Sequence, residues 1–364
     1  MIFGSFIQRS DLFSYNALKC LRNAYHFNDC TLCIDLCPEN AFSIVRNKLM
    51  LSDKKCIACA ACAGSCPTEA LTIRGFDPNA YAMNFNRLKE SEISCQKSIP
   101  CLGVFDAHHY IIMALRSFDT PTCDMTDCGE CPLNENGAVE SVIREKISAA
   151  NNFLAVAGSE KYIGTDEEKP EQNERRVFFR KALDAAKETL VADADISAAD
   201  FEKMGWTDTD TPFKLLLLSS TVKENLENLK RVQSEKSSTV FFNKAISFDL
   251  CSLCGDCIQF CPTKALETTA DGQGIMFTQA KCIGCSICNH ICKTDAMVSE
   301  GGFDLVKIAY ERARQLIRYE MAVCSECRCY YPYKGGGALC ERCGGFKAEF
   351  SDMFVLAKDQ RIIE

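Results

Sequence analysis

Two stretches in the second half of the chain decide the fold: CSLCGDCIQFCPTKAL (251–266) and CIGCSICNHICKTDAM (282–297). Each stretch has three cysteines spaced C-x2-C-x2-C and a fourth cysteine after three further residues. Three thiolates at this spacing hold one iron–sulfur cubane, and the fourth cysteine reaches the neighbouring cubane. The stretches therefore predict two [4Fe–4S] clusters, one on Cys251, Cys254, Cys257 and Cys292 and the other on Cys261, Cys282, Cys285 and Cys288.

The same pattern occurs in the first half of the chain. Four short segments match one another, each directly after a cysteine cluster: CPENAF (37–42), CPTEAL (66–71), CPTKAL (261–266) and CKTDAM (292–297). In addition, KLMLSDKKCIACAACAGSC (48–66) aligns without a gap with GIMFTQAKCIGCSICNHIC (274–292). We therefore expect a first module at residues 27–74, with one of its clusters on Cys37, Cys56, Cys59 and Cys62.

The other cluster of the first module lacks one ligand. Three cysteines remain for it: Cys30, Cys33 and Cys66. Its first expected ligand falls on Phe27, and aligning FNDCTLC with FDLCSLC (248–254) moves the gap to the third ligand. Cys20 is the natural substitute, although a cysteine on a helix is also an ordinary small buried residue. A three-iron cluster is one alternative, and ligands of another type are the other: His26, Asp29 and Asp35.

The two modules resemble the bacterial-type two-[4Fe–4S] ferredoxins and the polyferredoxin electron-transfer subunits. The resemblance covers residues 27–74 and 251–298. It implies an α+β fold with two ferredoxin-like dicluster modules and a role in electron transfer. Zinc is the alternative metal for clustered cysteines, but zinc sites use two C-x2-C pairs rather than tandem runs of four cysteines.

A third group of cysteines lies between the modules, at residues 94–133. The apolar spacing from residue 105 to residue 115 predicts a helix between its two pairs. Cys128 and Cys131 have the C-x-x-C form of a redox-active pair, but no thioredoxin-like βαβ pattern surrounds them. Cys123 is expected to be a spare cysteine in a strand. Four thiols are expected to hold a fifth [4Fe–4S] cluster or a zinc ion: Cys95, Cys101, Cys128 and Cys131.

The last cysteines lie in CSECRCYYPYKGGGALCERCGG (324–345). Two C-x2-C knuckles separated by a glycine-containing turn are typical of a zinc ribbon or a rubredoxin-like site. Zinc is favoured over a single iron because the chain already has many redox centres, and Cys329 is left over. The predicted metal ligands are Cys324, Cys327, Cys340 and Cys343.

The distribution of cysteines divides the chain into five parts. We expect a ferredoxin module with an N-terminal extension at 1–80, a cysteine-rich middle segment at 81–158, a helical insertion at 159–240, a second ferredoxin module at 241–300, and a helix plus a zinc-ribbon-like tail at 301–364. Apolar spacing predicts helices over 139–154, 179–190 and 305–321. Capping-box patterns at 197–200 and 221–224 are expected to open further helices.

The composition of the chain indicates its cellular compartment and the kind of partner it binds. The chain has 364 residues, 26 cysteines and a net charge of −8. Cysteines at such short gaps, without a secretion signal or an 18-residue apolar stretch, indicate metal ligands in a reducing cytoplasm rather than disulfides or a membrane span. An acidic chain does not fit nucleic acid, whose binding needs a basic surface. A protein partner with a basic docking surface fits better.

No nucleotide-binding motif and no pair of nucleophile and base is visible in the sequence. We therefore expect a non-catalytic electron-transfer subunit of a larger anaerobic oxidoreductase. Its partners would be a hydrogenase, a formate dehydrogenase, or a flavin or molybdenum enzyme, with soluble ferredoxin as a further carrier. The alternative is a stand-alone redox enzyme that uses the middle cysteine segment as a catalytic thiol or a substrate-binding cluster.

Overall fold

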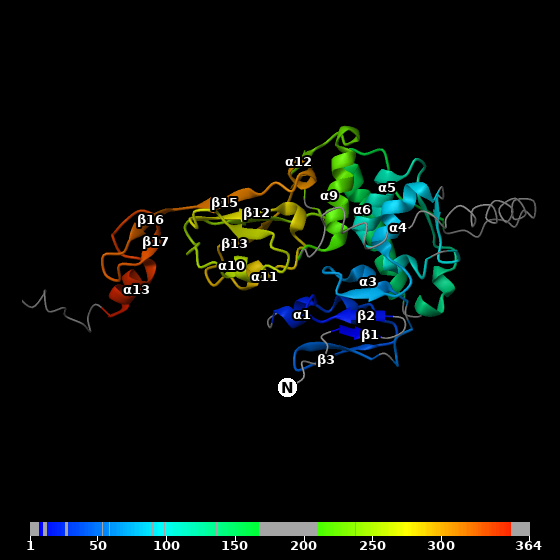
Figure 1. The fold of residues 1–364 in the computed structure, drawn as a ribbon, viewed down its shortest axis with the longest axis horizontal. Helices are drawn as coiled ribbons and strands as arrows, with labels where there is room; N and C mark the ends of the chain where they lie inside the picture. The colour runs from blue at the N-terminus through cyan, green and yellow to red at the C-terminus, as the bar shows by residue number, and fades with distance from the viewer. Residues whose placement is uncertain are drawn as a thin grey trace, which may run out of the picture.

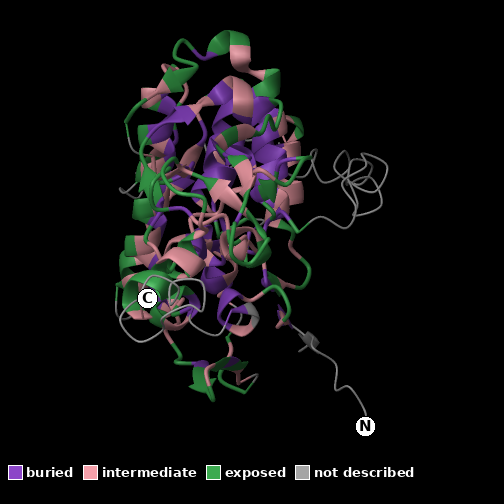
Figure 2. Cartoon of the chain, turned by 90° about the vertical axis from the view of Figure 1, so that its left-hand side faces the viewer, coloured by how far each residue is buried: buried purple, intermediate pink, exposed green. Residues whose placement is uncertain are grey.

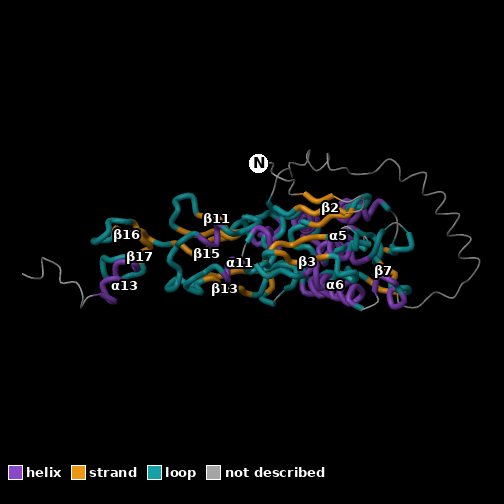
Figure 3. Tube along the Cα trace, turned by 90° about the horizontal axis from the view of Figure 1, so that it is seen from below, coloured by secondary structure: helices purple, strands orange, loops and turns teal. Residues whose placement is uncertain are grey.

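The computed structural model describes residues 7–9, 13–25, 28–52, 54–57, 59–88, 91–97, 99–134, 137–166, 210–236 and 238–350. Figure 1 shows an elongated molecule. The first module (residues 7–73) and a larger helical body lie at one end, the second module (residues 243–300) lies in the middle, and the C-terminal ribbon (residues 320–350) lies at the other end. Seen from below, the ribbon, the second module and the body follow one another along the long axis (Figure 3).

The first module consists of short antiparallel strands and one-turn helices. Strands β1 (Ile7–Arg9), β2 (Phe13–Asn16) and β5 (Leu71–Ile73) form one sheet, and β3 (Phe42–Val45) pairs with β4 (Lys48–Leu51) in a hairpin. The helices are α1 (Leu21–Ala24), α2 (Leu32–Asp35) and α3 (Ala61–Ser65). The apolar side chains of the strands form one small core together with cysteines: Phe13, Tyr15, Phe42, Leu49, Leu71, Cys33, Cys62 and Cys66.

The second module repeats this pairing. Strand β10 (Asn243–Ile246), before the first cysteine run, pairs with β13 (Met297–Glu300), after the second run. Between them β11 (Leu266–Thr268) pairs with β12 (Gly274–Phe277), and β15 (Arg314–Arg318) extends this sheet. The helices are α10 (Asp256–Gln259) and α11 (Ile287–His290), and η7 (Gln279–Lys281) precedes the second run.

One backbone conformation recurs in all four repeat segments. The fourth residue of each segment has a positive φ, namely 47° at Asn40, 52° at Glu69, 51° at Lys264 and 52° at Asp295. The alanine that follows is at least 97% buried in every copy: Ala41, Ala70, Ala265 and Ala296. L-residues other than glycine rarely adopt this left-handed conformation. Its fourfold recurrence therefore marks a common local structure after each cysteine cluster.

The middle segment folds into parallel strands with helices between them. Strands β6 (Glu92–Ile93), β7 (Thr122–Asp124) and β8 (Gly164–Asp166) form a parallel sheet, and α5 (Ala107–Arg116) and α6 (Ala138–Val156) connect them. Short 3-10 turns carry the cysteine loops: η2 (Leu102–Val104), η3 (Cys128–Glu130) and η4 (Pro132–Asn134). The expected helix and the strand at Cys123 are confirmed. The expected absence of a βαβ pattern is wrong, because strands of two or three residues are too short to show one in the sequence.

Helix α5 is the centre of the larger body. Nine of its ten residues are buried, since α4 (Pro78–Asn84), α6 and α9 (Phe213–Glu224) all pack against it. The same core includes η1 (Phe85–Arg87), η6 (Leu226–Asn228) and α12 (Leu305–Ala309). The first module docks on this body through α3, where a Cβ added to Gly64 would lie 2.2 Å from the carbonyl oxygen of Gly103. Only glycine permits so close an approach.

The described part of the region 159–240 belongs to this body. Leu217, Leu218 and Val222 of α9 lie in the core that α5 and α6 form. The helix expected to open at 221–224 is wrong, because Thr221 to Glu224 form the last turn of α9. Thr221 is fully buried and donates to the Leu217 carbonyl instead of capping a helix. The stripe at 179–190 and the capping box at 197–200 lie outside the described residues.

The C-terminal part contains more strand than expected. Strand β14 (Phe303–Asp304) pairs with β9 (Gln233–Ser234), and α12 ends at Ala309. The expected helix over 305–321 is therefore too long, since Leu316 lies in β15 and Met321 lies in β16 (Glu320–Val323). Strand β16 pairs with β17 (Tyr330–Tyr333), and α13 (Glu341–Phe350) follows.

The parts of the molecule differ in how far their residues are buried. Buried residues concentrate in the larger body, whereas exposed residues surround the C-terminal end (Figure 2). The ribbon buries few side chains, and α13 has no fully buried residue. It therefore needs a stabilising element other than an apolar core. Among the described helices, none combines the length and the apolar character needed to cross a membrane.

Candidate iron–sulfur and metal sites

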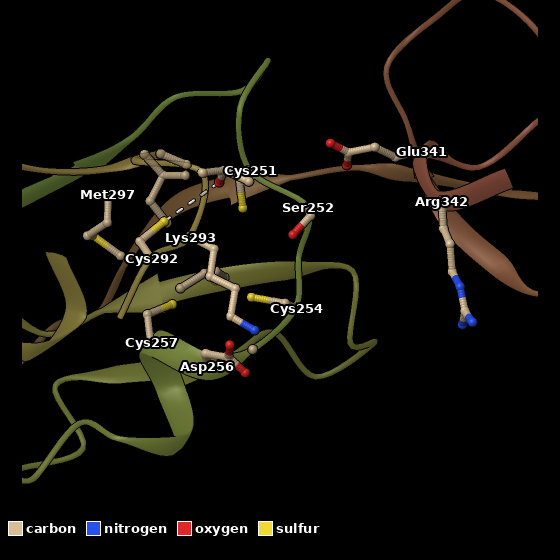
Figure 4. Close-up of a pocket in the computed structure, with 15 residues that line it drawn as sticks. Cys251, Ser252, Cys254, Asp256, Cys257, Cys292, Lys293, Met297, Glu341 and Arg342 are labelled. Atoms are coloured by element: carbon tan, nitrogen blue, oxygen red, sulfur yellow. Dashed lines mark hydrogen bonds between the residues drawn. The ribbon is translucent and has the colours of Figure 1, made fainter. Parts of the chain in front are cut away.

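The first predicted ligand set of the second module lines one cavity. Cys251, Cys254, Cys257 and Cys292 surround a space of about 360 Å³ (Figure 4). Gly255, with a φ of 81°, begins α10 and places Cys257 in its first turn. The Tyr319 hydroxyl donates to the Phe248 carbonyl at 2.6 Å and to the Cys251 carbonyl at 2.9 Å. These bonds hold the loop that carries the first cysteine against β15.

The second ligand set of this module also converges. Burial, together with the nearby Cys288 and Cys261 thiols, raises the pKa of Cys285 to about 11. Burial likewise raises the pKa of Cys282 to about 12, while the ammonium of Lys244 opposes this shift. Lys244 is itself buried and donates to Asn289 Oδ1 at 2.6 Å and Ser299 Oγ at 2.7 Å. Buried thiols resist ionisation alone, so a positively charged iron centre is what would stabilise them as thiolates.

In the complete ligand set of the first module, neighbouring thiols also raise the pKa of a cysteine. Burial raises the pKa of Cys62 well above its usual value, and the thiols of Cys59, Cys37 and Cys56 add to the shift. The backbone N–H of Ala41 donates to Cys37 Sγ at 3.3 Å. The equivalent bond runs from Ala70 to Cys66 Sγ, also at 3.3 Å. The repeated left-handed turn therefore aims a backbone donor at the cysteine sulfur.

Cys20 lies beside the incomplete set of the first module. One pocket is lined by all four thiols of this set: Cys20, Cys30, Cys33 and Cys66. Cys33 is the second residue of α2, as Cys62, Cys257 and Cys288 are the second residues of their helices. It therefore occupies the third ligand position, and the vacant position is the first. Asp29 and Asp35 are exposed, and Asp35 accepts a hydrogen bond from Thr31 at 2.7 Å. His26 and Phe27 lie outside the described residues.

The four predicted cysteines of the middle segment surround a further cavity. Cys95, Cys101, Cys128 and Cys131 line a space of about 310 Å³. Cys95 follows β6 and Cys128 follows β7, so the cavity lies at the carboxyl end of the parallel strands, where α/β folds place their ligands. Four acidic side chains also line it: Asp124, Asp127, Glu130 and Glu140. Cys123 does not line this cavity, and burial raises the pKa of its thiol.

The ribbon cysteines form a much tighter group. The sulfur atoms of Cys324, Cys327, Cys340 and Cys343 all lie within 4.8 Å of one another. Cys327 Sγ and Cys340 Sγ are 3.8 Å apart, which matches the edge of a tetrahedron with Zn–S bonds of about 2.3 Å. The Cys340 N–H bonds to the Cys324 sulfur at 3.3 Å and lowers the pKa of Cys324 to about 6. Cys329 is exposed and is not part of the group.

The distances between cysteine sulfur atoms distinguish the ribbon from the other cysteine sets. Within the described residues, the ribbon cysteines alone bring three or more ligand atoms within 4.8 Å of one another. The cysteines of the other sets are wider apart, as a four-iron cubane between them requires, because each thiolate binds a different iron. The ribbon residues thus fit a single ion, whereas the described cysteines of the two modules do not form so tight a group.

Two buried lysines near the cysteine sets were not predicted from the sequence. Lys214 is 2% exposed, and its ammonium donates to the Cys66 carbonyl at 2.9 Å. Lys244 is equally buried beside the second module's cysteines. The sequence signal for Lys214 is a lone lysine before four leucines, in PFKLLLL (212–218). A charge there is expected to be paired if the run is buried.

The comparisons agree with this geometry. Residues 234–298, which hold both cysteine runs of the second module, match the family model of the 4Fe-4S dicluster domain. A ferredoxin of Methanothermococcus thermolithotrophicus is 32% identical over 47 residues, which are 13% of this chain and 78% of that protein. The fold and the cysteine sites define an iron–sulfur protein with a ferredoxin-type domain for electron transfer. By this match the chain belongs to the ferredoxin family.

Proposed function

We propose that the chain is an iron–sulfur subunit that relays single electrons through four [4Fe–4S] clusters. The observation that carries this proposal is the convergence of sixteen cysteines into four sets, with the same left-handed turn after the cysteine that opens each repeat segment. Clusters bound there would accept and release one electron each. The protein's part is to hold them close together, exclude water and set their potentials through nearby charges and hydrogen bonds.

We further propose that Cys95, Cys101, Cys128 and Cys131 hold a fifth [4Fe–4S] cluster or a zinc ion. We also assign a structural zinc ion to the ribbon on Cys324, Cys327, Cys340 and Cys343. A ribbon with so few buried side chains gains its stability from such an ion. The four closely spaced sulfurs of the ribbon support zinc there. The wider middle cavity accommodates either group.

The partner in this proposal is a cytoplasmic anaerobic oxidoreductase of the hydrogenase, formate dehydrogenase, flavin or molybdenum class, or a soluble ferredoxin. The net charge of −8 favours a partner with a basic docking surface. Outside the ribbon, two predicted ligands on separate parts of the chain are exposed, Cys254 and Cys95. Each marks a place where an electron could enter or leave.

The experiment is an anaerobic reductive titration of the reconstituted protein, followed by EPR and by transfer of the electrons to an oxidised acceptor ferredoxin. The proposal predicts uptake of about four electrons per chain, one for each cluster of the two modules, and their release to the acceptor. Uptake of one electron or none would contradict the relay. Turnover of a small-molecule substrate by the isolated chain would favour the stand-alone redox enzyme instead.

A further inference from the structure

Helix α1 takes part in two structures at once. Cys20 forms its N-cap and completes the incomplete cysteine set of the first module. The next buried apolar residues, Leu21 and Tyr25, pack with Ile287 of the second module's α11 in a separate small apolar cluster. Figure 1 shows α1 at the edge of the first module that faces α11. The residue that supplies the missing ligand therefore begins the helix that joins the two modules.

The apolar cluster lies between cysteines of both modules. Cys30 packs against it from the first module, and Cys285 packs against it from the second. The ring of Tyr25 also lies 5.4 Å from the ring of Phe260, which directly precedes Cys261. We call these four residues the junction: Leu21, Tyr25, Phe260 and Ile287.

A second and independent contact joins the same two cysteine sets. Thr211 Oγ1 donates to the Thr263 carbonyl at 3.4 Å, in the repeat segment that follows Cys261. Three residues later, Lys214 Nζ donates to the Cys66 carbonyl at 2.9 Å. The chain before and into α9 thus touches the segment CPTKAL of the second module and the segment CPTEAL of the first. Both contacts place the Cys66 and Cys261 sets next to each other.

We propose that the two modules form one continuous relay, joined at the junction. The centres that face each other there are the cluster of Cys20, Cys30, Cys33 and Cys66 and the cluster of Cys261, Cys282, Cys285 and Cys288. This inference rests on the proposed function, since it needs clusters in both sets. One layer of packed side chains keeps adjoining backbones on the order of 10 Å apart. Tyr25 is a positioning residue, because it fills this layer and lies five residues from either neighbouring ligand, Cys20 and Cys30.

The test compares reconstituted proteins carrying Tyr25→Asp, Tyr25→Phe and, as a surface control, Tyr330→Asp. Tyr25 is 7% exposed, whereas Tyr330 is 74% exposed. A carboxylate at position 25 opens the apolar junction, while phenylalanine keeps the ring. Iron content and EPR of the fully reduced protein are measured for each, because neighbouring reduced clusters broaden and split each other's signals. Phe260→Asp repeats the test from the other side.

We expect all four variants to keep the wild-type iron content. Tyr25→Asp and Phe260→Asp should lose the interaction between the modules and keep the interactions within each module, whereas Tyr25→Phe and Tyr330→Asp should match the wild type. Unchanged spectra in both aspartate variants would overturn the inference. Loss of iron from a cluster in both aspartate variants would also overturn the inference. The junction would then only help the cysteines to bind their cluster. Eight or fewer irons in the wild type would instead overturn the proposed function.

Discussion

The ammonium of Lys214 in α9 donates a hydrogen bond to the carboxylate of Asp106, the N-cap residue of α5. Burial alone would raise the pKa of Asp106, but Lys214, His108 and Lys146 together outweigh burial and hold that pKa well below its usual value. Burial alone would lower the pKa of Lys214, but the nearby Asp106 and Glu69 carboxylates and the Cys66 thiol together raise it. Both groups are therefore charged in the folded protein. The pair ties α9 to the start of α5 and to the carbonyl of Cys66.

Breaking this buried pair should destabilise the body. Lys214→Met leaves the carboxylate of Asp106 buried without its partner, which costs about 3–5 kcal/mol in such pairs. Urea unfolding followed by circular dichroism measures the loss. The double variant Asp106→Asn with Lys214→Met should be less destabilised than the single variant, because no charge is then buried alone.

The control for that experiment is Lys230→Met. Lys230 pairs with Glu160 at 2.7 Å, but both side chains are largely exposed. Exposed ion pairs contribute little to stability, so the unfolding midpoint should stay at the wild-type value. Equal destabilisation by Lys214→Met and Lys230→Met would show that burial of the Lys214–Asp106 pair does not increase its contribution to stability.

Substitution of Cys20 should affect one cluster alone. Cys20→Ala leaves three cysteines in its set, and a cubane held by three thiolates tends to lose the iron that lacks a ligand. We expect an oxidised three-iron EPR signal and a loss of about one of 16 irons. Cys329→Ala is the matched control, since Cys329 is an exposed cysteine outside every set. A Cys20→Ala spectrum identical to that of the control would exclude Cys20 as a ligand.

The ribbon should lose its metal independently of the clusters. Cys327→Ser removes one of the four closely spaced sulfurs, so zinc should fall from about one per chain to near zero while iron is unchanged. Metal analysis by mass spectrometry after gel filtration provides the measurement. If iron fell in step with zinc, the ribbon and the modules would form one cooperative unit, contrary to this account.

Stability should fall in mild acid partly because of His109. Burial lowers the pKa of His109 to about 3, and its Nδ1 accepts the Asp106 N–H at 2.9 Å. The unfolded chain binds this proton below about pH 6.5 and the folded chain does not, so stability drops as the pH falls. The stability difference between wild type and His109→Gln should shrink by about 2 kcal/mol from pH 7.5 to pH 5. A pH-independent difference in urea unfolding would contradict the buried neutral imidazole.

Candidate cysteine sites could be proposed from the sequence because the spacing of each cysteine run is a local pattern. In the second module, each run C-x2-C-x2-C-x3-C supplies three ligands of one set and the fourth ligand of the other, and each repeat segment carries its own turn. The family model confirms the second module as a dicluster domain. The sequence also located α5 and α6, because their apolar residues follow the helical period over several turns.

The rest depends on contacts between distant residues. Lys214 and Asp106 are 108 positions apart, and neither shows its partner in the sequence. Cys20 was one of several alternatives for the missing ligand. The sequence could not decide among them, because the position of Cys20 near Cys66 depends on how α1 packs. The parallel sheet was missed because β6 has two residues and β7 has three. Leu316 and Met321 have helical spacing from Leu305, but they lie in strands because pairing with β12 and β17 overrides that pattern.

The most direct measurement is the metal content of the anaerobically reconstituted chain, with iron, acid-labile sulfide and zinc determined on the same sample. Four cubanes need about 16 irons and 16 sulfides per chain, and the ribbon adds about one zinc. A value near 20 irons would add a cluster in the middle segment. Eight or fewer irons after complete reconstitution would contradict the central claim, because eight irons fill only two of the four cysteine sets.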